Sequence, residues 1–329
     1  MTMTATLASY FSVLWLEHLA HLRVDAVVLA VVLAVTLARP LRRADLTDRA
    51  IGLVLFPVVT VGASGIGMLL PGVLGSALFV LAVSATIWIR RWGPRFTTAG
   101  ALATAPLLAT LILPAVPGRS PVLWTAVVAV IAYAWASVLV RRRPPEPRAS
   151  SPRISTRMAV QMGVALAASF AAGHVVFGTH WSWVVLTAFV VCSANRGRGD
   201  VLRKGMLRVA GAAAGTGVAT VLTGLLTPAN PWQVVAIFVL LAAGIWLRPV
   251  SYAYWAGCVT AALAFLYGYF GEAGTSLLLT RLGGVVLGGL IGAAASWFVL
   301  PVRGRDDPAA TVRAWLARVH AMVRRVLSR

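Results

Sequence analysis

Two arginines beside apolar runs have the residue type and spacing to bind an anion. Each precedes glycines at helical intervals, as Arg208-x-x-Gly211-x-x-x-Gly215 and as Arg281-x-x-Gly284 with further glycines every fourth residue. Such glycines form a small-residue stripe, along which a neighbouring helix can pack backbone to backbone. A guanidinium inside a protein is costly unless it is paired, and it is a good partner for a carboxylate. We therefore rank Arg281 first and Arg208 second as ligands of an anion.

The setting of each arginine allows a second interpretation. Arg49 and Arg208 adjoin basic loops, where membrane topology alone accounts for arginines. Arg281 instead begins an apolar run on the side that is otherwise poor in basic residues. Trp183 and Thr187 lie one helical turn apart in a short apolar segment, and we add both as residues that line the site. Trp183 could stack an aromatic ligand, although tryptophans near span ends usually lie at the membrane interface.

Five titratable residues at or within apolar segments are candidates for proton coupling. They are Asp25, Glu17, His174, His180 and Glu272. For each of them, an interfacial cap or a structural contact is the alternative.

The sequence lacks the motifs typical of enzymes. It contains no HExxH, no Gly-x-Ser-x-Gly, no paired-cysteine motif and no Walker loop. We therefore expect no catalytic residue, no metal site and no cofactor. Cys192 and Cys258 fall inside apolar runs, where small core residues are the simplest interpretation. Without a nucleotide-binding loop, transport by this chain would be passive, driven by an ion gradient, or powered by a separate subunit.

The composition excludes an ordinary soluble protein. Of the 329 residues, 59% are hydrophobic and 12% charged, and the mean hydropathy is +0.85. A soluble domain carries about 25% charged residues, which cover its surface. The excess of 29 basic over 9 acidic residues would indicate nucleic-acid binding in a soluble protein. Here the basic residues lie in short loops between apolar runs, which indicates membrane topology and no nucleic-acid partner.

Twelve apolar runs predict an all-α polytopic membrane protein, because a crossing takes about 20 residues. In the first half they are Ala5–Leu22, Val24–Ala38, Ala50–Leu70, Gly72–Ile89, Thr98–Ala115 and Pro121–Val140. In the second half they are Met158–Phe177, Trp181–Ala194, Gly205–Leu226, Pro231–Leu247, Ser251–Phe270 and Leu277–Leu300. We divide the chain into a first transmembrane repeat (1–140), a basic Pro-rich linker (141–157), a second transmembrane repeat (158–301) and a tail (302–329). The tail predicts a basic amphipathic helix on the inner leaflet, in contact with anionic lipids.

The basic loops of the two halves coincide at an offset of 157 residues, which places Arg39 on Arg196 and Arg91 on Arg248. Six spans in each half give two repeats of the same orientation, a plan known among transporters. With twelve spans, 26 of the 29 basic residues lie on one side. The positive-inside rule makes that side the cytoplasm and places both termini there. We expect a bacterial-type plasma membrane.

The second predicted span of each half, Val24–Ala38 or Trp181–Ala194, is unusually short. Short or broken spans at matching places in two repeats indicate a transporter binding site. Tilt or local thinning of the bilayer around a short helix explains the same observation.

Three motifs in the second half carry a resemblance to a known family. They are Trp183-Val-Val-Leu-Thr187, the basic loop Asn195-Arg-Gly-Arg-Gly-Asp200, and the span that begins Arg208-x-x-Gly211. This segment resembles the fusaric acid resistance family, also called aromatic acid exporters. The resemblance extends over 158–300 and is weaker across the first half. The large cytoplasmic domains of bigger members have no counterpart in this sequence.

The resemblance implies a plasma-membrane protein of six plus six spans that exports aromatic carboxylates, driven by the proton gradient. A more distant similarity to plant malate-type anion channels implies a homodimer. The expected partners are thus a small organic anion, the lipid bilayer and a second copy of the chain. The alternatives are a passive organic-anion channel of the same fold and a membrane scaffold without transport activity.

Overall fold

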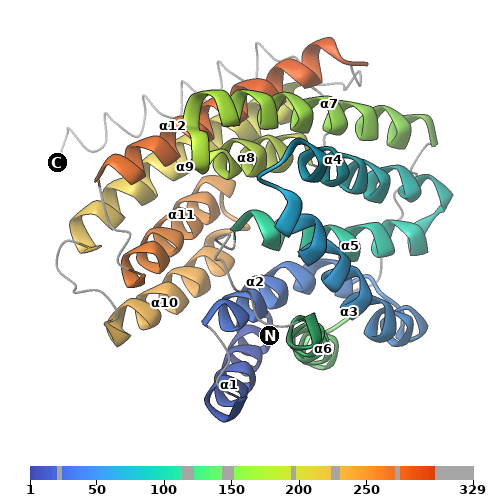
Figure 1. The fold of residues 1–329 in the computed structure, drawn as a ribbon, viewed down its shortest axis with the longest axis vertical. Coiled ribbons are helices and arrows are strands. Elements are labelled where there is room, and N and C mark those ends of the chain that lie inside the picture. The colour runs from blue at the N-terminus through green and yellow to red at the C-terminus, as the bar shows by residue number, and fades with distance from the viewer. Residues whose placement is uncertain are drawn as a thin grey trace. The chain divides into compact units, whose positions relative to one another are not determined.

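Helices make up the part of the chain that the computed structural model describes, which is residues 1–20, 24–112, 122–142, 152–193, 198–223, 230–270 and 275–300. The first half contains α1 (Thr2–Ala20), α2 (Val24–Leu41), α3 (Leu46–Leu69), α4 (Val73–Trp88), the 3-10 turn η1 (Ile89–Trp92), α5 (Pro94–Ile112) and α6 (Val122–Leu139) (Figure 1). The second half contains α7 (Pro152–Phe177), the 3-10 turn η2 (Gly178–His180), α8 (Ser182–Cys192), α9 (Arg198–Thr223), α10 (Pro231–Leu247), α11 (Tyr252–Tyr269) and α12 (Thr275–Phe298).

Six helices among the described residues are long and apolar enough to cross a membrane. They are the helical segments Leu46–Leu69, Val73–Trp92, Pro94–Ile112, Ile154–His180, Gly199–Leu222 and Leu279–Phe298. The other predicted spans are helical too, and four of them contain shorter apolar helices in α2, α6, α8 and α10. The all-helical, multi-pass fold predicted from the sequence is confirmed, with spanning length and composition in six of the twelve α-helices.

Six helices begin earlier than predicted, and the difference is largest for α7 and α9, because their basic segments are helical. α9 begins at Arg198 rather than at Gly205, and its first turns are supported by an ion pair between Lys204 and Asp200 at 3.1 Å. Arginine, lysine and leucine are good helix formers, and opposite charges four residues apart stabilise a helix. α7 begins at Pro152, inside the predicted linker, since proline is well tolerated in the first helical turn. Most of that linker and the whole predicted tail lie outside the described residues.

Both predicted short spans correspond to short apolar helices. α8 has 11 residues, which is about 17 Å of helix against about 30 Å of hydrocarbon. α2 continues past its predicted end to Leu41, and its apolar part Ala26–Leu41 is also shorter than the helices of spanning length. α6 and α10 contain short apolar helices as well, so among the described helices only α8 is much shorter than the rest.

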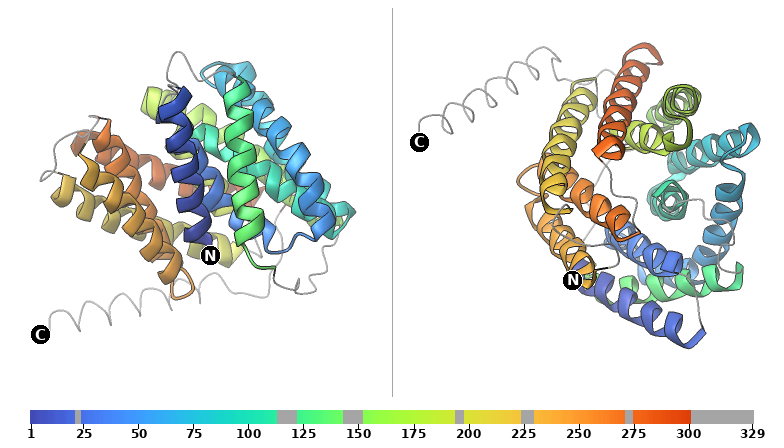
Figure 2. Two further views of the ribbon diagram at one scale, coloured as in Figure 1. Left: turned by 90° about the horizontal axis from the view of Figure 1, so that it is seen from below. Right: turned by 60° about the vertical axis from the view of Figure 1, so that its left-hand side comes forward.

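The chain divides into two compact units, Met1–Gly163 and Val164–Arg329. In the first unit α2 packs against α1, α5 and α6, and α3 packs against α4, α5 and α6. Figure 2 shows α1 and α6 side by side. α2 carries a stripe of alanine and leucine that is fully buried, and its members are Ala30, Leu33, Ala34, Leu37 and Leu41. Burial of this apolar stripe forms the core of the unit.

Arg49, near the start of α3, closes the C-terminal ends of α2 and α6. Its guanidinium donates hydrogen bonds to the carbonyl oxygens of Leu41 at 2.8 Å, of Val140 at 3.0 Å, and of Ser137. The last carbonyls of a helix have no donor within the helix, so this arginine supplies one to two helices at once. Arg49 therefore has a structural role in this unit.

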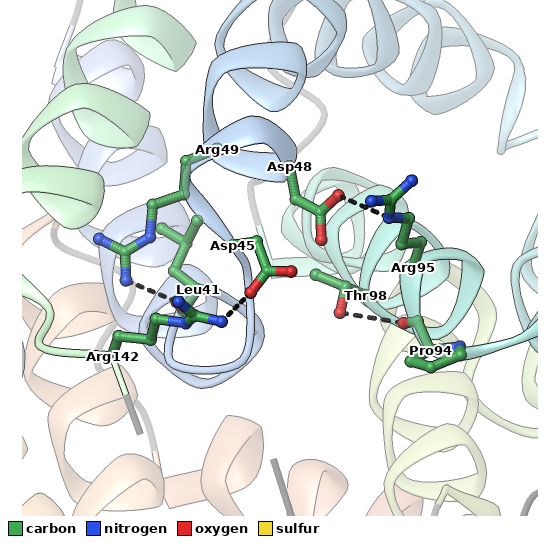
Figure 3. A network of polar contacts seen from close by, with 8 residues as sticks. All are labelled: Leu41, Asp45, Asp48, Arg49, Pro94, Arg95, Thr98 and Arg142. Carbon is green, nitrogen blue, oxygen red and sulfur yellow. Dashed lines mark hydrogen bonds and ion pairs between the residues drawn. The ribbon is translucent and has the colours of Figure 1, made fainter. Parts of the chain in front are cut away.

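Two ion pairs lie at the same corner of the first unit. Asp45 pairs with Arg142, and Asp48 pairs with Arg95 at 3.9 Å (Figure 3). The side chain of Arg95 is 77% exposed, so its pair is expected to contribute little to stability. The hydrogen bonds from Arg49 to the helix-end carbonyl oxygens connect α3 to α2 and α6 here. The two ion pairs contribute less to this connection.

The second unit is a row of helices in close contact. α8 packs against α12, α12 against α9, α9 against α11, and α11 against α10. Figure 1 shows α10 and α11 side by side. The glycine stripes predicted from the sequence lie at these contacts. A Cβ added at Gly211 or Gly215 would lie 2.3 Å from a backbone carbonyl oxygen of α11, and one at Gly288 would lie 2.3 Å from the carbonyl oxygen of Val184 in α8.

Two neighbouring glycines of α12 test this packing. An added methyl at Gly288 meets Val184 and Thr187, whereas one at Gly289 meets nothing within 4 Å. Overpacking a tight contact costs about 1–3 kcal/mol, so Gly288→Ala should lower the melting temperature of the purified chain in detergent. Gly289→Ala should leave it unchanged or raise it, because alanine is the better helix former. Equal melting temperatures for the two variants would contradict the close approach of α8 and α12.

Candidate functional site

Arg281 of α12 is a charged side chain enclosed by the second unit. The residue is 4% exposed. Its Nη1 donates a hydrogen bond to the carbonyl oxygen of Thr260 in α11 at 3.0 Å. Its Nε is buried without a hydrogen-bond partner. None of the ion pairs among the described residues includes Arg281, so no carboxylate there balances its charge.

The indole of Trp183 provides most of the remaining support for this guanidinium. The central carbon of the Arg281 guanidinium lies 4.2 Å from the centre of the Trp183 ring. Tyr267 of α11 packs edge-on to the same tryptophan, with ring centres 5.7 Å apart. A desolvated cation over an indole face is attracted by the ring quadrupole. In this conformation Trp183 therefore positions the arginine, and stacking of an aromatic ligand on it stays a prediction.

The glycine stripe of α12 explains why these two residues meet. Arg281 lies three residues before Gly284, and a Cβ at Gly284 would come within 3.0 Å of the Trp183 Cβ. Residues three apart share a helix face, so the side of α12 that packs on α8 also carries the arginine.

Arg208 of α9 binds the next turn of α8. Its Nε donates to Oγ1 of Thr187 at 3.2 Å, and its Nη1 donates to the hydroxyl oxygen of Tyr252 at 3.5 Å. Thr187 is fully buried, and Arg208 is partly buried. Arg208 also takes part in none of the ion pairs found within the described ranges.

The four predicted ligand-binding residues are thus brought together along α8. Trp183 and Thr187 are four residues apart on this helix, and each contacts one of the two arginines. The arrangement presents two guanidinium groups, on successive turns, whose polar partners are neutral oxygen atoms. Chemically, this arrangement is suited to binding an anion.

Sequence reasoning missed the contribution of α11. This helix supplies the Tyr252 hydroxyl, the Thr260 carbonyl and the Tyr267 ring. A backbone carbonyl leaves no mark in a sequence. Tyr252 and Tyr267 are 15 residues apart, which places their side chains on one helix face, and this spacing is a signal that could have found these two.

The proton-coupling candidates do not join this cluster as far as the structure describes them. His174 lies in a cluster of rings with Phe170 and Trp181, whose ring centres are 6.3 and 5.1 Å away and 5.1 Å from each other. His180 is within hydrogen-bond distance of the Thr179 hydroxyl, at 3.2 Å. Their coupling role stays a prediction.

Of the three acidic candidates, the structure describes the side chain of Glu17 alone. Glu17 lies in α1, in the first unit, and is partly buried. The Asp25 side chain and Glu272 lie outside the described residues. Within the described ranges, no group of three or more His, Cys, Asp or Glu side chains could hold a metal ion.

The segment that contains this cluster matches a known protein family. Residues 164–295 match a family model described as fusaric acid resistance protein-like, which confirms the resemblance inferred from the sequence. The matched segment covers less than half of the chain, and it contains Arg208, Arg281, Trp183 and Thr187. The family is one of membrane transporters rather than of enzymes. No curated protein and no solved structure matches the chain.

Trp183 offers a test of how Arg281 is supported. Trp183→Phe keeps a ring face under the guanidinium, whereas Trp183→Leu removes it. We expect the leucine variant to be less stable than the phenylalanine variant by about 1–2 kcal/mol, the size of a desolvated cation–π contact. Unfolding of the purified chain in detergent measures the difference. In an Arg281→Met background the difference should shrink, since no cation remains; a difference that persists there would show that packing alone is responsible.

Proposed function

We propose that this chain is a secondary transporter that exports small organic acids, aromatic ones among them, across the plasma membrane, because residues 164–295 match the model of a family of membrane transporters. The observation that carries this proposal is the buried guanidinium of Arg281. Among the described residues, its polar and cation–π partners are one carbonyl oxygen and one indole ring, and its Nε has no hydrogen-bond partner. The ligand would supply the missing negative charge.

The energetics favour a carboxylate as that ligand. Removing a charge from water is expensive, and a partner of opposite charge offsets the cost only in good geometry. Hydrogen bonds from a guanidinium to a carboxylate are roughly twice as strong as those between neutral groups. A bound acid would therefore satisfy Arg281 better than the Thr260 carbonyl does. Trp183 and Tyr267 would give an aromatic acid an apolar, aromatic environment.

The driving force is proposed to be the proton gradient. The sequence holds no nucleotide-binding loop, so the chain itself offers no means of using ATP. Candidate proton carriers remain Asp25, Glu17, His174, His180 and Glu272.

We further propose that the two units are parallel repeats. In the first unit the helices make contact in the order α2, α6, α3, α5 and α4, and in the second in the order α8, α12, α9, α11 and α10. Each helix of the second series comes six helices after its counterpart in the first. This common order, together with the shared offset of the basic loops, supports a duplication of six helices.

The proposed orientation follows from charge. Basic residues on one side of twelve spans place the loops after even-numbered spans, and both termini, in the cytoplasm. A tail that binds anionic lipids and a homodimer complete the proposal.

Export can be tested with purified chain in liposomes loaded with radiolabelled benzoate, with protein-free liposomes as the leak control. We expect efflux that increases when a pH gradient is imposed at zero voltage. Arg281→Gln should reduce it at least about tenfold, since a charged hydrogen bond contributes about 1.5–3 kcal/mol. Arg95→Gln makes the same change at an exposed site and should have no effect.

The other outcomes distinguish the alternatives. Efflux that depends on Arg281 but ignores the pH gradient would indicate a channel. No protein-dependent efflux of benzoate or of several other aromatic acids would contradict transport of this substrate class and favour a scaffold.

The orientation has its own test. Single cysteines replace Arg119 and Arg198 in a chain whose Cys192 and Cys258 have been changed to serine. We expect a membrane-impermeant thiol reagent to label position 119 in intact cells and position 198 only after permeabilisation. Labelling of both positions from the same side would contradict twelve spans.

A further inference from the structure

Building on the proposed function, we infer that the site recognises acids with two anionic groups, one bound by Arg281 and the other by Arg208. The inference concerns the class of substrate at the same site. It rests on three features of the second unit, which are the placement of the two guanidinium groups, the nature of their present partners and the position of nearby acidic side chains.

The two guanidinium groups are held on successive turns of one helix face. Arg281 covers the ring of Trp183 at 4.2 Å, and Arg208 donates to the hydroxyl of Thr187 at 3.2 Å. Side chains four residues apart on a helix have Cβ atoms about 5–6 Å apart. α8 therefore holds the two cationic groups at successive turns of one helix.

Every acceptor that the structure shows for these arginines is a neutral oxygen. Arg281 uses the Thr260 carbonyl, and Arg208 uses the hydroxyls of Thr187 and Tyr252, the latter at a long 3.5 Å. The buried Nε of Arg281 has no acceptor. Carboxylate oxygens form stronger bonds with guanidinium than these groups do. An acid can thus displace the neutral acceptors at both arginines.

Among the described residues, the acidic side chain that is nearest to Arg208 in the sequence already has a basic partner. Asp200 precedes Arg208 by eight residues on α9 and forms an ion pair with Lys204 at 3.1 Å. Lys204 in turn donates to the carbonyl oxygen of Ser193, just after the end of α8. Both Asp200 and Lys204 are therefore used to join α9 to α8.

Two cationic groups on successive turns of one helix favour a dianion over a monoanion. Neither Arg281 nor Arg208 takes part in an ion pair among the described residues. A monocarboxylate would neutralise one guanidinium and leave the other in place. A dicarboxylate balances both and relieves their repulsion, so the second carboxylate should strengthen binding.

Benzoate and isophthalate isolate this effect, because they differ by a single carboxylate on the same ring. The measurement is the melting temperature of the purified chain in detergent as each acid is titrated, since a ligand that binds the folded state raises it. We expect isophthalate to reach half its effect at a concentration about tenfold lower than benzoate, as one added charged hydrogen bond would give.

Variants assign the advantage to Arg208. Arg208→Gln should bring isophthalate down to the level of benzoate while benzoate is little changed. Arg208→Lys should keep part of the advantage, since it keeps the charge but loses the planar fork. Arg203→Gln, the same change at an exposed position of α9, should behave as the unmodified chain does. Arg281→Gln should weaken both acids.

The outcomes separate this inference from the proposed function. Equal half-effects of the two acids in the unmodified chain, or an isophthalate advantage that survives Arg208→Gln, would overturn the inference. The proposed function would then stand, provided that Arg281→Gln still weakens both acids. If neither acid stabilises the chain and neither is carried by it in liposomes, the proposed function fails and this inference fails with it.

Discussion

A guanidinium enclosed by apolar helices, without a carboxylate among the described residues to balance it, is the constraint that explains most of the second unit. Arg281 is held by an indole face and by one carbonyl oxygen, which together leave part of its hydrogen-bonding capacity unused. A buried ionic group contributes to stability only when its partners are well placed. The arrangement is therefore difficult to explain as a stabilising feature and fits the anion-binding role that we propose for it.

Close backbone packing makes this arrangement possible. Gly284 and Gly288 bring α12 against α8 where Trp183 and Thr187 project, and Gly211 and Gly215 bring α9 against α11. Without hydrophobic driving force between helices in lipid, such small-residue contacts are a main source of association. The same contacts place α11 beside both arginines. The residues that pack the helices together therefore also position the residues of the site. α8 has only 11 residues, which is less than a crossing takes. A helix of this length can have both of its ends inside the hydrocarbon region.

Much of this could be predicted from the sequence, for reasons that particular residues make plain. Apolar runs bounded by charge or proline gave α10 its observed ends, Pro231 and Leu247. Arginines followed by regularly spaced glycines pointed to the helix faces that pack closely. The sequence predicts a start of α9 at Gly205, because a basic run before a span is typical of a loop, whereas the residues of this run favour helix and α9 begins at Arg198. The role of Trp183 under Arg281, and the Thr260 carbonyl, depend on which helices are neighbours, and no spacing within one helix contains that information.

On the proposed duplication, the two units differ in the residues that occupy matching positions. At the offset of 157 residues, Trp183 and Thr187 correspond to Ala26 and Ala30, which are buried in an apolar stripe of α2. Arg208 and Arg281 correspond to Ile51 and Trp124. The arginine of the first unit that has the Arg-x-x-Gly spacing, Arg49, is occupied by the carbonyls that end α2 and α6. On the proposed duplication, the first unit has therefore kept the helix order and lost, or never acquired, the charge pair. Anion binding is then a property of the second unit, and this agrees with the extent of the family match, which lies wholly within it.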